Sequence, residues 1–306
     1  MTKNQMKSML FSIRALSPVH CGIGQGTNDI DLPTARHPVS GHPLVPGSSL
    51  KGVLKDEFLG GKYYSKENEN KLCALFGGDT SGEFASAISV GDANLLALPA
   101  RSNFGTFAYL ASTYTLQMFK DLCRRAGTGT CPVIPEFGQV DPNNGHFKVA
   151  LTADSVLKAP NTAKVYLEEL DLMEDESLRK TCDDWASLLA EQFFADEEGR
   201  ALFKKRFAIV DDNALNFLTE TALPVDAHIA IDDDTGCVRK GMLWYEETMA
   251  PETLLAGIIS VDRSFKPEFK VLADDLSALI SNRTLYCQIG GKATTGKGFV
   301  EMCVKG

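Results

Sequence analysis

One stretch of the chain, residues 20–52, gathers the side chains best suited to chemistry. It is rich in Gly and Pro, and it holds three of the five histidines and two acids separated by one residue, Asp29 and Asp31. A carboxylate can hold a largely hydrated Mg²⁺ ion, and a histidine such as His20 can donate or accept a proton. A loop this long inside a folded domain is usually functional or disordered, and its apolar residues favour an ordered, functional loop.

Two glycine-containing segments have the composition of anion-binding sites. Residues 47–52 (GSSLKG) open a predicted helix with free N–H groups, two hydroxyls and a lysine. Residues 290–298 (GGKATTGKG) approach a nucleotide-binding P-loop, but Gly298 stands where that motif needs the hydroxyl that holds magnesium. Taken separately, the first could be a plain helix start and the second a plain bend. Together they favour a polyphosphate ligand, and nucleic acid fits better than a mononucleotide.

The distribution of charge keeps a nucleic-acid partner open although the net charge is −9. Residues 165–200 hold twelve acids and three bases, so this segment accounts for the whole net charge. Residues 282–306 are locally basic, with four Lys or Arg and one Glu. Such a local patch can bind phosphate whatever the charge of the whole chain.

Cysteine spacing and hydropathy indicate the compartment. The eight cysteines are scattered without zinc-binding spacing, which predicts free thiols in a reducing cytoplasm. No apolar run reaches the ~18 residues that a membrane helix needs, so no membrane partner is expected. Residues 7–17 are interpreted as the first strand and not as a signal peptide.

The elements that must position the two loops alternate between strand and helix. Strands are predicted at 7–17, 85–98, 105–112, 253–260 and 298–304, and helices at 48–59, 113–126, 207–219 and 268–281. Ser48 or Ser49 is the predicted N-cap of the first helix, and Thr113 that of the second. Residues 226–246 read as a hairpin around an Asp/Gly turn. This order predicts an α+β fold with a mainly antiparallel sheet.

Several motifs carry a resemblance to a known family. They are LSPVH at 16–20, IDLP at 30–33, GHPLVPGSSLKG at 41–52, PARS at 99–102, LWYEE at 243–247 and QIGGKATTGKG at 288–298. The pairing of the first and last of these is specific. On these residues the chain resembles the RAMP superfamily of CRISPR–Cas proteins, and most of all the Cas-seven-type repeated backbone subunit of type III-B (Cmr) effector complexes.

The resemblance implies a fold and a set of partners. The fold is an RRM-like (ferredoxin-like) palm within a single RAMP domain over 1–306, with a helical, acidic insertion at about 127–206 and a thumb-like hairpin region at 213–250. The partners are CRISPR RNA, single-stranded target RNA, other Cmr-type subunits and further copies of the chain in a filament. The implied activity is cleavage of bound target RNA at six-nucleotide intervals by the assembled complex.

The resemblance also places roles on residues. It makes Asp31 the catalytic residue and the ligand of a divalent metal, with Mg²⁺ expected, while His20 and Glu246 are candidates to assist. The residues predicted to contact RNA are Arg36, Ser48, Ser49, Lys51, Gly52, Gly290, Gly291, Lys292, Gly296 and Lys297.

Several alternatives stay open at this stage. The chain could be a non-catalytic scaffold that binds guide RNA, or a precursor-RNA processing nuclease centred on His20. His20 could also bond the backbone and hold the loop, and Glu246 could be structural. Because residues i and i+2 of a strand share a face, Asp29 could act jointly with Asp31.

Overall fold

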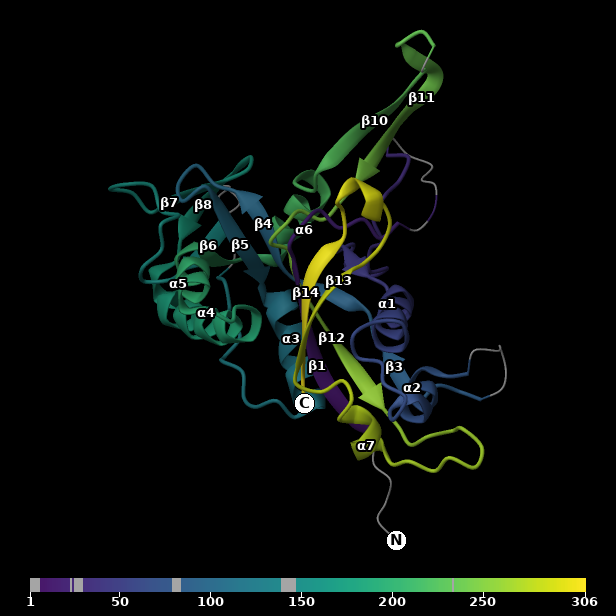
Figure 1. Cartoon of the computed structure of the whole chain (residues 1–306). Coiled ribbons are helices and arrows are strands. Elements are labelled where there is room, and N and C mark those ends of the chain that lie inside the picture. Colours follow the sequence, from purple (N-terminus) through teal and green to yellow (C-terminus); the bar gives the residue numbers. More distant parts are fainter. Residues whose placement is uncertain (1–5, 23, 25–29, 79–83, 139–146, 233) are drawn as a thin grey trace.

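The structure is a computed structural model that describes residues 6–22, 24, 30–78, 84–138, 147–232 and 234–306 (Figure 1). Asp29 lies outside the described residues. The strands are β1 (Lys7–Ala15), β2 (Leu44–Val45), β3 (Ile88–Val90), β4 (Ala93–Arg101), β5 (Phe107–Ser112), β6 (Phe147–Leu151), β7 (Lys164–Leu167), β8 (Leu170–Glu174), β9 (Phe207–Val210), β10 (Val225–Ile231), β11 (Val238–Glu247), β12 (Leu254–Val261), β13 (Arg283–Gln288) and β14 (Phe299–Lys305). The helices are α1 (Gly47–Leu59), α2 (Glu69–Phe76), α3 (Thr113–Ala126), α4 (Arg179–Phe193), α5 (Glu197–Arg206), α6 (Asp212–Thr221) and α7 (Ala273–Ser277), with short 3₁₀ turns η1 (Glu176–Leu178) and η2 (Ala293–Thr295).

Within the described part of the chain, twelve strands form one sheet. Their order is β13-β14-β1-β12-β4-β5-β9-β6-β8-β7, with β2 beside β4 and β3 beside β12. Neighbouring strands are antiparallel except for β5 with β9 and β6 with β8, which are parallel. The predicted α+β class with a mainly antiparallel sheet is therefore confirmed.

Strand β1 lies inside the sheet and is buried on both faces. Phe11 and Ile13 pack into a cluster with α1 and α2, whereas Leu10 points to the other face and joins a cluster with α3 and α4. This double burial explains why apolar residues point to both sides of the strand, since both of its faces are covered by helices.

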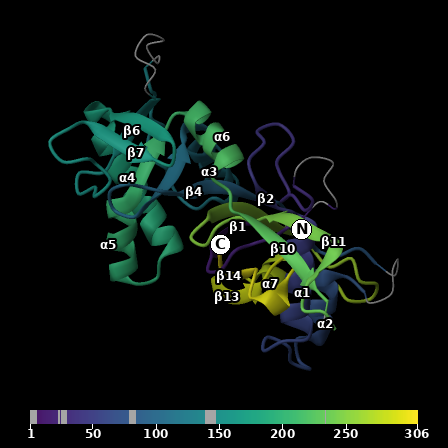
Figure 2. The ribbon, with the colours of Figure 1, turned by 90° about the horizontal axis from the view of Figure 1, so that it is seen from above.

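Two lobes share the sheet, and Figure 2 shows them side by side. One lobe carries α1, α2 and α7 over the strands at the β13 end. The second lobe carries α4 and α5 on one face of the β5–β9 region and α6 on the opposite face. There Leu215 and Leu218 of α6 join a third apolar cluster. The acidic residues 165–200 belong to this second lobe.

The predicted hairpin exists and stands apart from the sheet. Among the residues that the structure describes, β10 and β11 form a separate two-stranded antiparallel sheet, and the ribbon projects away from the body (Figure 1). A two-stranded ribbon is marginally stable by itself. Its conformation therefore depends on what holds its base.

Several sequence predictions need correction. The helix at 113–126 is confirmed, but Ser112 and not Thr113 caps it, through a reciprocal pair of bonds with Thr115. Helix α1 has Pro46 and not Ser48 or Ser49 at its N-cap, and Pro46 makes no side-chain cap hydrogen bond. The predicted helix at 207–219 divides into strand β9 and helix α6. The predicted helix at 268–281 shrinks to the short α7, and strand β13 after it was not predicted.

Two further expectations can be compared with the structure. All eight cysteines are free thiols, as predicted. Among the described residues, no helix is both long and apolar enough to cross a membrane.

Two glycines of α1 give a matched test of how closely this helix packs. A Cβ at Gly47 would lie 2.2 Å from the backbone oxygen of Val90, whereas a Cβ at Gly52 would meet nothing within 4 Å. We expect Gly47→Ala to lower the free energy of unfolding by about 1–3 kcal/mol, because rigid backbone must move. Gly52→Ala should raise it by about 0.5–1 kcal/mol through helix propensity. Urea denaturation of both variants measures the two changes, and equal effects would contradict the packing.

Candidate functional site

The loop that carries Asp31 is joined to the base of the hairpin by backbone hydrogen bonds. The N–H of Leu32 donates to the oxygen of Tyr245 at 3.0 Å, and the N–H of Glu247 donates to the oxygen of Leu32 at 3.0 Å. The backbone N–H of Tyr245 donates to Oδ2 of Asp31 at 2.8 Å. Asp31 is exposed, so one of its oxygens is fixed by the hairpin while the side chain stays open to solvent.

His20 is buried at the same place and connects three segments. Its Nδ1 lies 2.8 Å from the backbone oxygen of Glu247, and its own backbone oxygen accepts the N–H of Gly291 at 3.0 Å. A Cβ at Gly290 would lie 2.1 Å from that same oxygen, and Gly290 has a φ of +81°. These contacts favour the second reading of His20, in which it bonds backbone and holds the loop.

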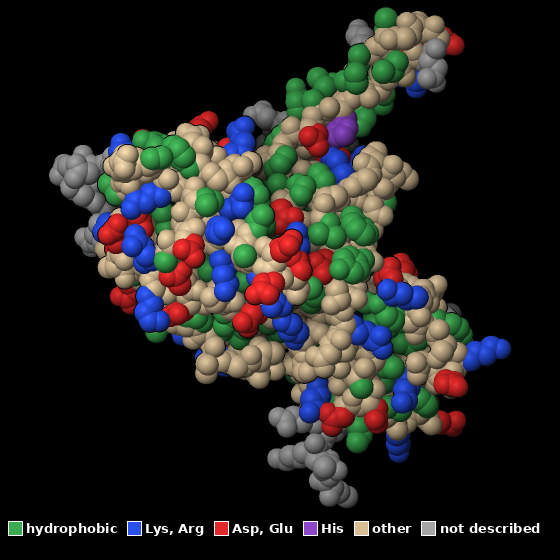
Figure 3. All heavy atoms as spheres, turned by 60° about the vertical axis from the view of Figure 1, so that its left-hand side comes forward, with side chains coloured by type: hydrophobic (Ala, Val, Ile, Leu, Met, Phe, Trp, Pro, Cys, Tyr) green, Lys and Arg blue, Asp and Glu red, His purple; other side chains and the backbone are tan. Residues whose placement is uncertain are grey.

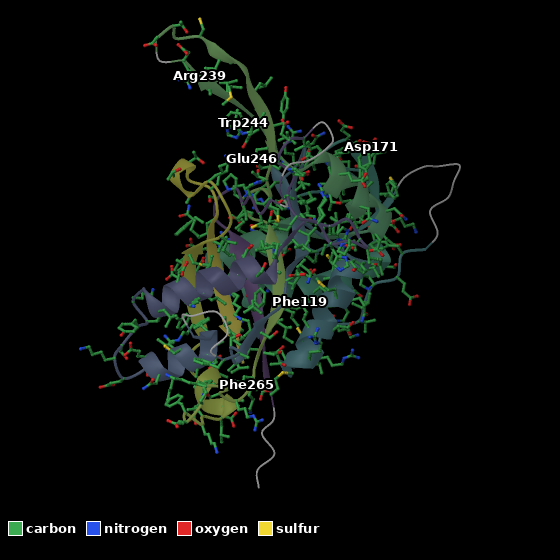
Figure 4. All side chains as sticks on the ribbon, turned by 90° about the vertical axis from the view of Figure 1, so that its right-hand side faces the viewer. Phe119, Asp171, Arg239, Trp244, Glu246 and Phe265 are labelled. Carbon is green, nitrogen blue, oxygen red and sulfur yellow. The ribbon has the colours of Figure 1, made fainter. Side chains whose placement is uncertain are left out.

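Glu246 lies in a buried ion cluster and not on an open surface. Its side chain is fully buried, and its Oε1 accepts a hydrogen bond from Nζ of Lys297 at 2.7 Å. Lys297 also donates to Oδ2 of Asp226 at 2.9 Å, and Nζ of Lys292 lies 3.6 Å from Oε2 of Glu246 (Figure 4 labels Glu246 at the hairpin base). The cluster therefore ties the glycine-rich loop to both strands of the hairpin.

The charges in this cluster support each other. Burial works to raise the pKa of Glu246, but the hydrogen bond and the positive charge of Lys297 outweigh it, so the pKa is lowered from its ordinary value of 4.5. Burial works to lower the pKa of Lys297, but its bonds to Glu246 and Asp226 raise the pKa above 10.5. Both groups are therefore held in their charged forms at neutral pH.

Two predicted RNA contacts are engaged inside the protein. Lys297 is only 7% exposed and its ammonium is held by two carboxylates. Arg36 donates from Nη2 to Oε1 of Glu247 at 2.6 Å and to the oxygen of Thr219, and from Nη1 to the oxygen of Gly41. The contacts within the protein account for both cations, so the RNA surface proposed below includes neither.

The other basic residue of the glycine-rich loop has a different environment. Lys292 has a left-handed backbone, with φ of +65°, and its side chain is 39% exposed. Its Nζ lies 5.8 Å from the ring centroid of Trp244. Gly290, Gly291 and Gly296 of the same loop are exposed, so this part of the loop is open to a ligand.

The predicted residues of α1 form a second, separately anchored group. The N–H of Gly47 donates to Oδ1 of Asp92 at 2.7 Å, and Nζ of Lys51 donates to Oγ of Ser86 at 2.5 Å. Ser48 and Gly52 are exposed, whereas Ser49 and Lys51 are half-buried. The structure thus gathers His20, Asp31, Glu246, Lys292 and Lys297 at the hairpin base. It holds the α1 group through Ser86 and Asp92, which lie on either side of β3.

A cavity of about 490 Å³ opens beside Asp31. It is lined by Asp31, Leu32, Gly241, Met242, Leu243, Trp244 and Lys292. In the part of the chain that the structure describes, no group of three or more His, Cys, Asp or Glu side chains could hold a metal ion. One oriented carboxylate at an open cavity fits Mg²⁺, which keeps several waters and binds through one or two carboxylates together with substrate phosphate.

Sequence reasoning missed Glu247 as a connecting residue. Its carboxylate accepts the N–H of Thr34 at 3.0 Å and pairs with Arg36, while its backbone bonds Leu32 and His20. The alternation of the LWYEE motif indicates that Glu246 and Glu247 face opposite sides of the ribbon. It does not identify the partners of Glu247, because Thr34 and Arg36 are more than 200 positions away.

The buried pair can be compared with an exposed one. Glu246→Gln should lower the free energy of unfolding at neutral pH by about 3–5 kcal/mol, because Lys297 stays buried with one carboxylate fewer. Since the folded pKa of Glu246 is lowered, its contribution is complete above pH 4.5 and is lost as the pH falls through that lowered pKa. Urea denaturation at several pH values below 4.5 should therefore show that the free energy of unfolding falls less with pH in the variant than in the wild type.

Asp274→Asn is the matched control. It removes a pair with Lys7 at 2.8 Å whose two side chains are 52% and 71% exposed, so its effect should stay within about 1 kcal/mol. If both variants lowered the free energy of unfolding equally, burial of the Glu246 pair would make no difference to stability.

Comparison with known proteins identifies the family. The model of the RAMP superfamily matches residues 12–301. The CRISPR system Cmr endoribonuclease Cmr4 of Pyrococcus furiosus is 33% identical over 303 residues, which cover 98% of this chain and 96% of that protein. The crystal structure of oligomeric Cmr4 from the same organism has a TM-score of 0.71 at 27% identity and covers 98% of both chains.

A third relative shows likeness of fold alone. A chain in the cryo-EM structure of the Type III-B Cmr-beta bound to cognate target RNA has a TM-score of 0.70 at 20% identity, with 97% of this chain and 96% of that chain covered. The predicted resemblance is confirmed by these matches over almost the whole sequence. This chain belongs to the RAMP superfamily and, within it, to the Cmr4 family.

Proposed function

We propose that this chain is a repeated backbone subunit of a CRISPR RNA-guided complex and cleaves target RNA that is bound to the guide. The observation that carries the proposal is the exposed carboxylate of Asp31, oriented by the N–H of Tyr245 at the mouth of a cavity beside a projecting hairpin. A relative of 33% identity is named an endoribonuclease. The partners that we propose are CRISPR RNA, single-stranded target RNA, other Cmr-type subunits and further copies of the chain in a filament.

The palm of the proposed RRM-like fold consists of β14, β1, β12 and β4. These strands are consecutive in the sheet and each is antiparallel to its neighbours, with β1 and β12 at the centre. Helices α1 and α3 cover its opposite faces. On this assignment, β10 and β11 form the thumb inserted ahead of β12.

The guide backbone would contact two open groups of residues. One is the start of α1, where Ser48, Ser49, Lys51 and Gly52 provide hydroxyls, a cation and N–H groups. The other is the exposed part of the glycine-rich loop, with Gly290, Gly291, Lys292 and Gly296. Both groups supply contacts to phosphate and none to base edges, so they would bind a guide of any sequence.

The reaction proposed at Asp31 is attack of a ribose 2′-oxygen on the adjacent phosphorus. The new P–O2′ bond forms as the P–O5′ bond breaks, the 2′ proton is removed, and the 5′ oxygen leaves and is protonated. Asp31 would hold a divalent metal, which supplies positive charge to the phosphate oxygens. Tyr245 fixes the direction of the carboxylate, and the buried His20 fixes the loop against the hairpin.

Asp31→Asn separates the endonuclease from a non-catalytic scaffold. The amide keeps an acceptor for the N–H of Tyr245 but loses the charge, so cleavage in the reconstituted complex should fall at least about 100-fold while guide and target binding stay unchanged. Gel analysis of target products and a binding titration measure the two effects. If the Asp31→Asn complex still cut the target at regular intervals, the chain would be a non-catalytic scaffold and another subunit would be the nuclease.

A processing nuclease centred on His20 predicts a different result. The isolated chain would then cleave repeat RNA, and His20→Ala would abolish that cleavage without changing protein stability. The buried, bonded ring makes us expect neither outcome: we predict no cleavage of repeat RNA and a lower unfolding midpoint for the variant.

The proposed phosphate contacts have a salt signature. Removal of one phosphate contact should lower the slope of log K against log salt by about 0.7–0.9, so Lys51→Ala and Lys292→Ala should each show a shallower slope on guide RNA of any sequence. Lys180→Ala is the control, because this exposed lysine pairs with Asp184 in the acidic segment 165–200 of the second lobe. A slope unchanged in both test variants would contradict phosphate contact at these sites.

A further inference from the structure

The projecting hairpin has two different faces. Because Asp226 pairs with Glu246 and His228 with Trp244 in the register, these side chains share the face that looks toward the glycine-rich loop. The other face carries exposed Val225, Ile229, Leu243 and Tyr245. Figure 3 shows hydrophobic side chains gathered along the ribbon.

The first face carries a stacked aromatic pair. The rings of His228 and Trp244 lie 5.5 Å apart at an interplanar angle of 17°. Trp244 lies between the ion cluster at Glu246 and the hairpin tip near Arg239 (Figure 4). It also lines the cavity that contains Asp31 and Lys292. A half-buried indole, an ammonium and an oriented carboxylate thus face the same space.

The second tryptophan of the chain shows what a purely structural indole looks like here. Trp185 is fully buried, and its Nε1 donates to the oxygen of Val133 at 2.9 Å. Trp244 is half-buried on a ribbon that no other strand of the described chain covers. An indole left partly open beside a cation has the properties of a stacking platform for a ligand.

We propose that Trp244, backed by His228, is a stacking site for an unpaired RNA nucleobase, with Lys292 placed for the phosphate of the same nucleotide. The proposal rests on the function proposed above, and it assigns a nucleotide site to the Asp31 cavity. The flat apolar ring meets the base, the ammonium meets the anion, and the volume of about 490 Å³ accommodates a nucleotide. The base comes from either the guide or the target strand; if it comes from the target, its stacking brings the neighbouring phosphate toward Asp31.

The chain carries its own probe for this site. It has two tryptophans, and Trp185 is inaccessible, so RNA-dependent quenching of fluorescence reports on Trp244. The experiment uses the full chain with Asp31→Asn, which keeps RNA intact, and adds guide RNA and then a complementary target. We expect quenching in one of the two steps, which identifies the strand that supplies the base. Trp244→Phe should abolish the quenching, because only Trp185 then emits.

Affinity provides a second measurement. Trp244→Ala should weaken RNA binding about 5- to 100-fold, and Trp244→Phe should restore most of the loss because a ring remains. Phe265→Ala is the control: this aromatic is also exposed but lies at the far end of the molecule from the hairpin (Figure 4), and its loss should change neither signal. Rescue by Phe separates stacking from a general collapse of the ribbon.

The outcomes distinguish the inference from the proposed function. If wild type binds and cuts RNA while Trp244 fluorescence and the affinity of Trp244→Ala are unchanged, the inference is wrong. The pair of His228 and Trp244 then only stabilises the hairpin. Quenching with Phe rescue but no cleavage of target RNA by the reconstituted wild-type complex supports the stacking site and contradicts the proposed nuclease. Failure of the chain to bind either strand overturns both.

Discussion

The buried ion pair between Lys297 and Glu246 is the constraint on which the site depends. In the described part of the chain the hairpin forms no ladder with the main sheet, so its direction is set at its base. There the ammonium of Lys297 reaches Glu246 on one strand and Asp226 on the other. Removing a single member of such a cluster leaves a buried charge without its partner, which is far more costly than losing a surface pair. The ribbon is therefore held by charge where it has no sheet to hold it.

The same base fixes Asp31 by a second, independent set of contacts. Strand β11 bonds the loop through Leu32 and Tyr245 on its free edge, and the carboxylate of Glu247 takes the N–H of Thr34. Segments that are distant in sequence thus converge on residues 245–247. A shift of the hairpin would move the Asp31 carboxylate with it, so the hairpin and the proposed cleavage site behave as one body.

What the sequence could predict follows from how local the signals are. The α+β class, the hairpin and the helix at 113–126 depend on period, turn residues and caps within a few positions, and all three are confirmed. The predicted helix at 268–281 was too long and strand β13 was missed, because α7 is limited by its packing against α2, β1 and β12, and β13 by its pairing with β14. Lys297 and Arg36 looked like free cations because the carboxylates that bind them are far away in sequence. Glu247 was missed for the same reason, since its partners are invisible in a local motif.

The glycines near the C-terminus show how one composition serves two purposes. Sequence reasoning attributed all of them to phosphate, yet a Cβ at Gly290 would strike the backbone of His20 and one at Gly298 the backbone of Ile289. Both positions exclude a side chain because protein backbone stands where the Cβ would be, although Gly290 itself stays exposed while Gly298 is buried. Residues 291–296 remain open to solvent, and Lys292 extends from them toward the Asp31 cavity. The closed positions make the loop rigid against the hairpin, and this rigidity is what allows the open positions to present a cation at a fixed place.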